Sequence, residues 1–185
     1  MDPKMQATTA VQLLKPLVEG TQADQLGNQT PCSDWKVRDL LNHVIGGGHM
    51  FAAGLRDEPP QGGDATDLVG DDHKAAFRTA IDEFSAALAD TDDLDKLVSL
   101  PFGTLPAVAA LQLAAGDLLV HSWDLARATG QPFDPPAEFV EASYGFFQVA
   151  VNDDLRAAGM FGPPYEVPAD ASALDKLLAH AGRQA

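Results

Sequence analysis

Apolar residues recur three or four positions apart along most of the chain. This spacing marks four long stretches, residues 10–18, 37–45, 77–88 and 105–130, and two shorter ones, residues 139–151 and 174–178. It places the apolar side chains on one face of an α-helix. Strand patterns are nearly absent, apart from one short extended piece at residues 97–102. The pattern therefore predicts an all-α protein, a bundle of helices packed around a central seam.

Proline, glycine and capping residues predict where the first helices begin and end. Pro16 should kink the first helix or mark the start of its second part. Either Thr30 or Ser33 is the candidate N-cap of the second helix. Residues 57–71 are rich in proline, glycine and acids, and they predict a solvated loop. Such a loop fits a crossover between two helices.

The longest predicted helix has clear signals at both ends. Thr104 can cap it, Pro106 suits its first turn, and Gly130 ends it. Asp134 then opens the next helix. The long helix is apolar around most of its circumference, which is typical of a helix packed on more than one side.

Composition and charge limit the number of domains and the classes of partner. The chain has 185 residues, of which 45% are hydrophobic, so we interpret residues 1–185 as a single domain with a sizeable core. Twenty-seven acidic residues against twelve basic ones give a net charge of −15. No cluster of lysine and arginine is present to bind phosphates or anionic lipids. Nucleic acids and membrane surfaces are therefore excluded as partners.

Further sequence features predict a cytoplasmic protein. The first residues lack the basic start and the apolar run of a signal peptide. The longest apolar-rich run, residues 105–115, is too short to span a bilayer. Cys32 is the only cysteine, which rules out a disulfide within the chain.

Three polar residues interrupt the longest apolar helix. Asp117, His121 and Asp124 lie within about 60° of one another on the helix surface. Carboxylates buried there without a partner would destabilise the fold. A charge-compensating group is therefore expected beside this stripe.

A divalent metal ion would offset the cost of burying the stripe. Asp117 and His121 are four residues apart, a spacing at which two side chains converge on one ion. His43, at the edge of the apolar face of the second helix, is the best candidate for a third ligand. Two imidazoles and one carboxylate suit zinc, nickel, iron or manganese, and they leave positions open for water or substrate.

Other interpretations of the stripe remain open at this point. Aspartate and histidine at this spacing occur by chance in many helices, so the side chains of the stripe could satisfy one another without a metal. Asp124 either accepts the imidazole N–H of His121 and orients it, or pairs with Arg127. Trp123 neighbours the proposed site and could form one of its walls.

The remaining candidates are interpreted as structural. His49 lies on another side of its helix and is expected at the surface, while His73 and His180 have no patterned partner and are expected to be structural or solvated. Cys32 is interpreted as a packing residue rather than a reactive thiol. Glycines 46–48 lack the spacing of a phosphate loop, and they permit close helix approach or a ligand near the backbone.

Three blocks of the sequence together carry a resemblance to a known family. They are "TPCSDWKVRDLLNHVIGG", "DLLVHSWDLARATGQ" and "VPADASALDKLLAHAGR". The chain resembles, over nearly its whole length, actinobacterial metal-binding proteins related to the N-terminal domain of mycothiol-dependent maleylpyruvate isomerase, in the DinB/YfiT-like superfamily. The resemblance implies a four-helix bundle with additional short helices. It also implies a divalent metal, usually zinc or nickel, held by His43, Asp117 and His121.

The same resemblance implies a function. The metal would activate a low-molecular-weight thiol such as mycothiol for attack on a small electrophile, in a transferase-like or isomerase-like reaction. The isomerase has a glutamate where this chain has Asp117, and an additional C-terminal domain, which argues against maleylpyruvate itself as substrate. Similar proteins commonly form homodimers. The alternative is a non-catalytic bundle that binds a metal or a thiol.

Overall fold

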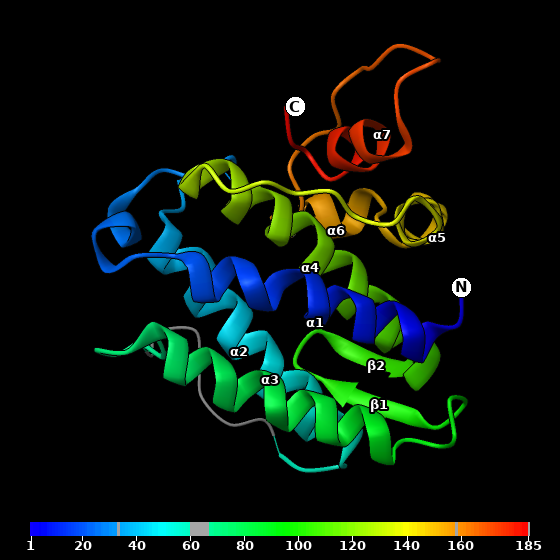
Figure 1. Cartoon of the computed structure of the whole chain (residues 1–185). Helices are drawn as coiled ribbons and strands as arrows, with labels where there is room; N and C mark the ends of the chain where they lie inside the picture. Colours follow the sequence, from blue (N-terminus) through cyan, green and yellow to red (C-terminus); the bar gives the residue numbers. More distant parts are fainter. Residues whose placement is uncertain (33, 60–66, 158, 185) are drawn as a thin grey trace.

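A computed structural model describes residues 1–32, 34–59, 67–157 and 159–184, which fold mainly into helices (Figure 1). The four long helices are α1 (Pro3–Gly20), α2 (Val37–Leu55), α3 (His73–Asp90) and α4 (Ala107–Thr129). Both α1 and α2 contact α3 and α4, so the four helices enclose one core. The predicted all-α class and the four-helix bundle are confirmed.

Each helix of the bundle contributes fully buried apolar side chains to the core. Leu14 of α1, Leu41 of α2, Phe84 of α3 and Leu119 of α4 are at most 1% exposed. Burying a side chain of this size stabilises a fold by about 1.5–3 kcal/mol. The helical spacing of apolar residues therefore selects the faces that meet in the core.

The first two helices differ from the predicted boundaries. Pro16 lies inside α1 without dividing it, because the turns on both sides are buried against the bundle. Thr30 does not cap α2. Its segment folds back on itself, with Gln29 paired to Lys36 in a β-bridge, and Lys36 is the N-cap of the helix that begins at Val37. The other predicted cap, at position 33, and residues 60–66 of the loop predicted at 57–71 lie outside the described residues.

A small hairpin precedes α4. Strands β1 (Leu97–Leu100) and β2 (Gly103–Pro106) pair in antiparallel register, with Thr104 opposite Ser99. The predicted cap at Thr104 and the predicted first-turn position of Pro106 are therefore wrong. Strand pairing keeps residues 103–106 extended, and α4 begins only at Ala107, with Pro106 as its N-cap.

The C-terminal helices pack outside the bundle, on the side of α4 (Figure 1). They are α5 (Ala137–Ala150), α6 (Asp153–Ala157) and α7 (Ala173–His180). α5 contacts both α4 and α7, and it begins three residues after the predicted start at Asp134. The short α6 and the 3₁₀ helix η1 (Ala23–Gly27) are too short for periodicity to reveal. Among the described residues, no helix has the length and apolar character needed to cross a membrane.

Candidate metal centre

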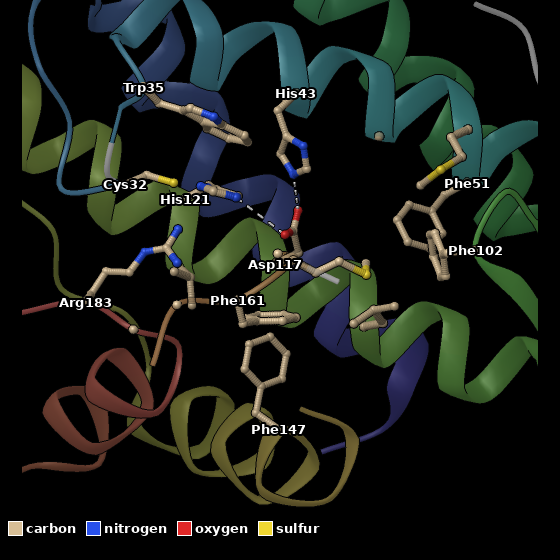
Figure 2. A pocket seen from close by; sticks show the side chains of 18 residues that line it. Cys32, Trp35, His43, Phe51, Phe102, Asp117, His121, Phe147, Phe161 and Arg183 are labelled. Carbon is tan, nitrogen blue, oxygen red and sulfur yellow. Dashed lines mark hydrogen bonds and ion pairs between the residues drawn. The ribbon is translucent and has the colours of Figure 1, made fainter. Parts of the chain in front are cut away.

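The packing of α2 against α4 brings the three predicted ligands together. One imidazole nitrogen from each of His43 and His121 and one carboxylate oxygen of Asp117 lie within 4.8 Å of one another. His43 Nε2 is 3.2 Å from Asp117 Oδ2, and His121 Nε2 is 3.5 Å from Asp117 Oδ1. In Figure 2 the imidazole of His43 lies above the carboxylate of Asp117 and that of His121 lies to its left. Asp117 and His121 meet because they are one turn apart on α4.

A buried ion pair holds the far side of the His121 ring. His121 Nδ1 donates a hydrogen bond to Asp124 Oδ2 at 3.0 Å, and Arg183 Nη2 donates to the same oxygen at 2.9 Å. The side chain of Asp124 is 0% exposed and that of Arg183 is 8% exposed. Asp124 thus makes the imidazole contact rather than a pair with Arg127, whose guanidinium lies over the Trp123 ring. With Nδ1 engaged, Nε2 of His121 is directed toward Asp117.

The aromatic wall of the site is Trp35. Its ring stacks on that of His121 with centroids 5.6 Å apart and planes at 17°, and it also lies 5.0 Å from the ring of His43. The predicted role of Trp123 as a wall is wrong, because Trp123 is not among the described residues that line the cavity. Two steps along α4 rotate its side chain about 200° away from His121.

Opposite charges set the protonation of the site in the absence of a metal. Burial raises the pKa of Asp117, but the neighbouring His43 and His121 outweigh it and hold that pKa well below its usual range. Burial lowers the pKa of His121, but Asp117 and Asp124 outweigh it and raise the pKa to about 9. His121 is therefore an imidazolium at neutral pH, and a metal ion at Nε2 would displace its proton.

The same balance applies to Asp124. Its burial raises its pKa, whereas His121 and Arg183 lower it by more, so the carboxylate stays ionised. Burial also lowers the pKa of the Arg183 guanidinium, and Asp124 outweighs this effect and raises it. The pair remains fully charged inside the protein.

The donor set fits a divalent transition metal. Two imidazole nitrogens and one carboxylate oxygen are ligands that zinc and its neighbours accept, and three protein ligands leave coordination positions free. The side chains of His43 and Asp117 are 39% and 29% exposed, so one side of the group faces solvent and the cavity. A small molecule could reach an ion held there.

A cavity of about 320 Å³ adjoins the three residues (Figure 2). It lies between α2 and α4. Its other borders are the β1–β2 turn, α5, residues 159–162 before α7 and residues 182–183 after α7. Polar side chains gather at one end, whereas the rest of the wall is apolar. The apolar lining includes Met50, Phe51, Phe102, Leu113, Phe147 and Phe161.

The other candidates have contacts of their own. Cys32 lines the cavity, and burial raises its pKa to about 11, so it is a neutral thiol at physiological pH. His49 is half-buried and donates to Glu83 Oε2 at 2.6 Å, rather than lying free at the surface. His73 and His180 each donate to a main-chain carbonyl. These contacts account for the three histidines outside the centre.

Sequence reasoning did not find two residues of the site. Trp35 lies in the bridged turn before α2, and Arg183 lies after α7. Neither belongs to a helical pattern with the ligands. The one available signal was that both fall inside sequence blocks that carry the family resemblance.

The chain is similar to proteins already known. Residues 7–126 match the family model of the mycothiol maleylpyruvate isomerase N-terminal domain, a range that includes His43, Asp117, His121 and Asp124. Two uncharacterized proteins of Mycobacterium tuberculosis, from strains CDC 1551 / Oshkosh and ATCC 25618 / H37Rv, are each 34% identical over 99% of this chain and 98% of their own.

Two solved structures are similar in fold. They are crystal structures of the mycothiol-dependent maleylpyruvate isomerase and of a histidine-to-alanine mutant of it, with TM-scores of 0.64 and 0.66. Each match covers 85% of this chain and 71% of the other, at 15% and 13% identity. Such low identity concerns the fold and not the chemistry. By its match to the family model over residues 7–126, the chain belongs to the mycothiol maleylpyruvate isomerase N-terminal domain family.

Proposed function

We propose that this protein is a metal-dependent enzyme that uses a low-molecular-weight thiol, of the mycothiol type, in an isomerase-like or transferase-like reaction on a small electrophile. One observation carries this function. Donor atoms of His43, Asp117 and His121 lie within 4.8 Å of one another on the wall of a cavity. The family name and the solved isomerase structures add the thiol.

The three residues would hold a divalent ion, zinc or nickel. A bound ion of this kind would act as a Lewis acid and convert a coordinated thiol to a thiolate at neutral pH. His43 and His121 must each present a neutral ring nitrogen to it, and Asp117 supplies the negative charge.

The surrounding residues position these donors. Asp124 accepts the Nδ1 hydrogen of His121, which leaves Nε2 as the donor atom, and Arg183 keeps Asp124 in place. Trp35 covers one face of the imidazole. Burial keeps Cys32 a neutral thiol in the absence of a metal, which supports a nucleophile from outside the chain.

Metal content tests the proposed centre directly. Tag-free protein, reconstituted with zinc or nickel and desalted, should hold near one equivalent of metal by mass spectrometry. His43→Ala and His121→Ala should each lose most of it, because two ligands rarely hold an ion. His49→Ala is the matched control and should keep the wild-type content, since its imidazole pairs with Glu83. A metal-free wild type, or equal content in all variants, would contradict the proposed function.

Turnover separates an enzyme from a protein that only binds. With thiol and electrophile supplied, His121→Ala should abolish thiol-dependent turnover, whereas Cys32→Ser should retain it. Loss of turnover in Cys32→Ser with metal still bound would overturn the use of an external thiol. A metal with no exchangeable coordination position would indicate a structural site.

A further inference from the structure

The cavity has two chemically different ends. Asp117 and His121 lie at one end, together with Arg183 (Figure 2). Phe51 and Phe102 lie at the other end in the same view. Phe51 is about two turns along α2 from His43, and Phe102 is in the β1–β2 turn. A molecule held at the ligands can therefore place a second group against apolar side chains.

The guanidinium of Arg183 makes its hydrogen bonds to other groups of the protein. Its Nε and Nη2 donate to Asp124, and its Nη1 donates to the carbonyl of Ala181 at 2.8 Å. Among the described residues that line the cavity, it is the only arginine or lysine. A substrate carboxylate in the apolar half would lose its hydration without gaining a cation, which is strongly unfavourable.

Gly47 lies on the wall of the cavity, one turn from His43 and one turn from Phe51 along α2. A Cβ atom added at this position would meet no other atom within 4 Å. A larger side chain there would therefore occupy the cavity rather than clash with the bundle.

We infer that the cavity selects a small substrate with an uncharged apolar group, such as a phenyl or alkyl tail, over a dicarboxylate such as maleylpyruvate. The polar end would hold the reacting group, and Met50, Phe51 and Phe102 would hold the tail. The binding of the reacting group at the polar end rests on the proposed function. The preference of the apolar half follows from its lining, with or without a metal.

Thiol binding to cobalt-loaded protein tests the preference for an apolar group over a dicarboxylate. Thiolate ligation of cobalt gives a charge-transfer band that can be titrated. The probes are 3-phenylpropane-1-thiol and mercaptosuccinate, which share a thiol but differ in the tail. We expect the phenyl thiol to bind about tenfold more tightly or better, since its ring leaves water. Equal or tighter binding of mercaptosuccinate would overturn the selection.

Gly47→Leu should remove this difference, because the leucine fills the path to the apolar half. The variant should fold, since leucine favours a helix more than glycine does. Gly145→Leu is the matched control. Position 145 is also a helical glycine with open space around it, but it does not line the cavity. An unchanged preference in Gly47→Leu would overturn the role of the apolar half.

A second experiment, on metal-free protein, tests the preference of the cavity for apolar groups independently of the proposed function. Titrations of metal-free protein with 3-phenylpropan-1-ol and with succinate, followed by NMR, need no ion. The alcohol should shift signals of the cavity residues and lose this effect in Gly47→Leu, whereas succinate should not bind there. If cobalt or thiol binding fails but this result holds, the proposed function fails and the apolar selection stands. If the alcohol does not bind at the cavity, the selection is wrong.

Discussion

At the scale of single residues, Asp124 is a buried carboxylate that depends on its charged partners. It has no exposed surface, and its carboxylate accepts hydrogen bonds from both His121 and Arg183. Removing one member of a buried ion pair leaves the other charge without a partner, which costs more than the pair contributes. Asp124 therefore supports the attachment of the C-terminal segment and orients His121 of the proposed metal centre.

Asp124→Ala should lower the free energy of unfolding by about 3–5 kcal/mol, because Arg183 is left buried and unpaired. Metal affinity of the folded fraction should fall by about 10–100-fold, since the imidazole of His121 loses its orienting partner. Urea denaturation and metal titration measure the two effects. Arg78→Ala is the comparison, because Arg78 pairs with Glu19 at the surface, where water screens the charges. Equal destabilisation by both substitutions would refute the structural role of Asp124.

At the scale of elements, the contact between α4 and α5 depends on one glycine. A Cβ atom added at Gly116 would lie 2.2 Å from Cε1 of Phe147, whose side chain is fully buried. Such a distance is far below van der Waals contact, so either the ring or the helix would have to move. Because Phe147 also lines the cavity, the spacing of the two helices sets one of its walls.

Gly116→Ala should destabilise the protein by about 1–3 kcal/mol through overpacking at this contact. Gly145→Ala, in an open position on α5, should instead stabilise it by roughly 0.5–1 kcal/mol, because alanine is the better helix former. Chemical denaturation of the two variants and the wild type measures both. Stabilisation by Gly116→Ala would mean that α5 is not packed against α4 as described.

At the scale of the whole molecule, charge is far from balanced. The net charge of −15 opposes the compact state, and each further negative charge adds to this repulsion. Among the described residues, His121 carries one of the few positive charges in the interior, and its imidazolium lies between two carboxylates. Stability of the metal-free protein should therefore respond to pH in the range where this imidazolium titrates.

The free energy of unfolding of the metal-free protein should fall as pH rises from about 6.5 to about 9. The pKa of His121 is raised to about 9 in the folded state, so its stabilising effect is full below the unfolded pKa of about 6.5 and is lost as pH passes the folded pKa. Denaturation across this pH range measures the slope. His121→Asn should show a flatter dependence, and the difference should persist in high salt, which screens surface charge but not this buried contact. A free energy of unfolding of the wild type that stays constant or rises over this pH range would contradict the prediction.

The amino-acid sequence by itself determined the features that depend on local geometry. Helical spacing of apolar residues predicted the bundle helices and their buried faces, because each face is defined within a few turns. The separation of Asp117 and His121 likewise placed both on one face of α4 before any packing was known. The extended piece at residues 97–102 was predicted, but its partner strand was not, because β-pairing joins separate segments.

Only the tertiary structure decided which distant residues complete the site. Arg183 reaches Asp124 across 59 positions of the chain, and Trp35, rather than Trp123, covers His121. Neither contact follows from a repeat along the sequence, because each depends on how loops and the C-terminal segment fold back onto α4. The donor distances from His43 and the apolar half of the cavity depend in the same way on the packing of α2 against α4. Helix periodicity acts over a few residues, whereas these contacts are set by the packing of the whole chain.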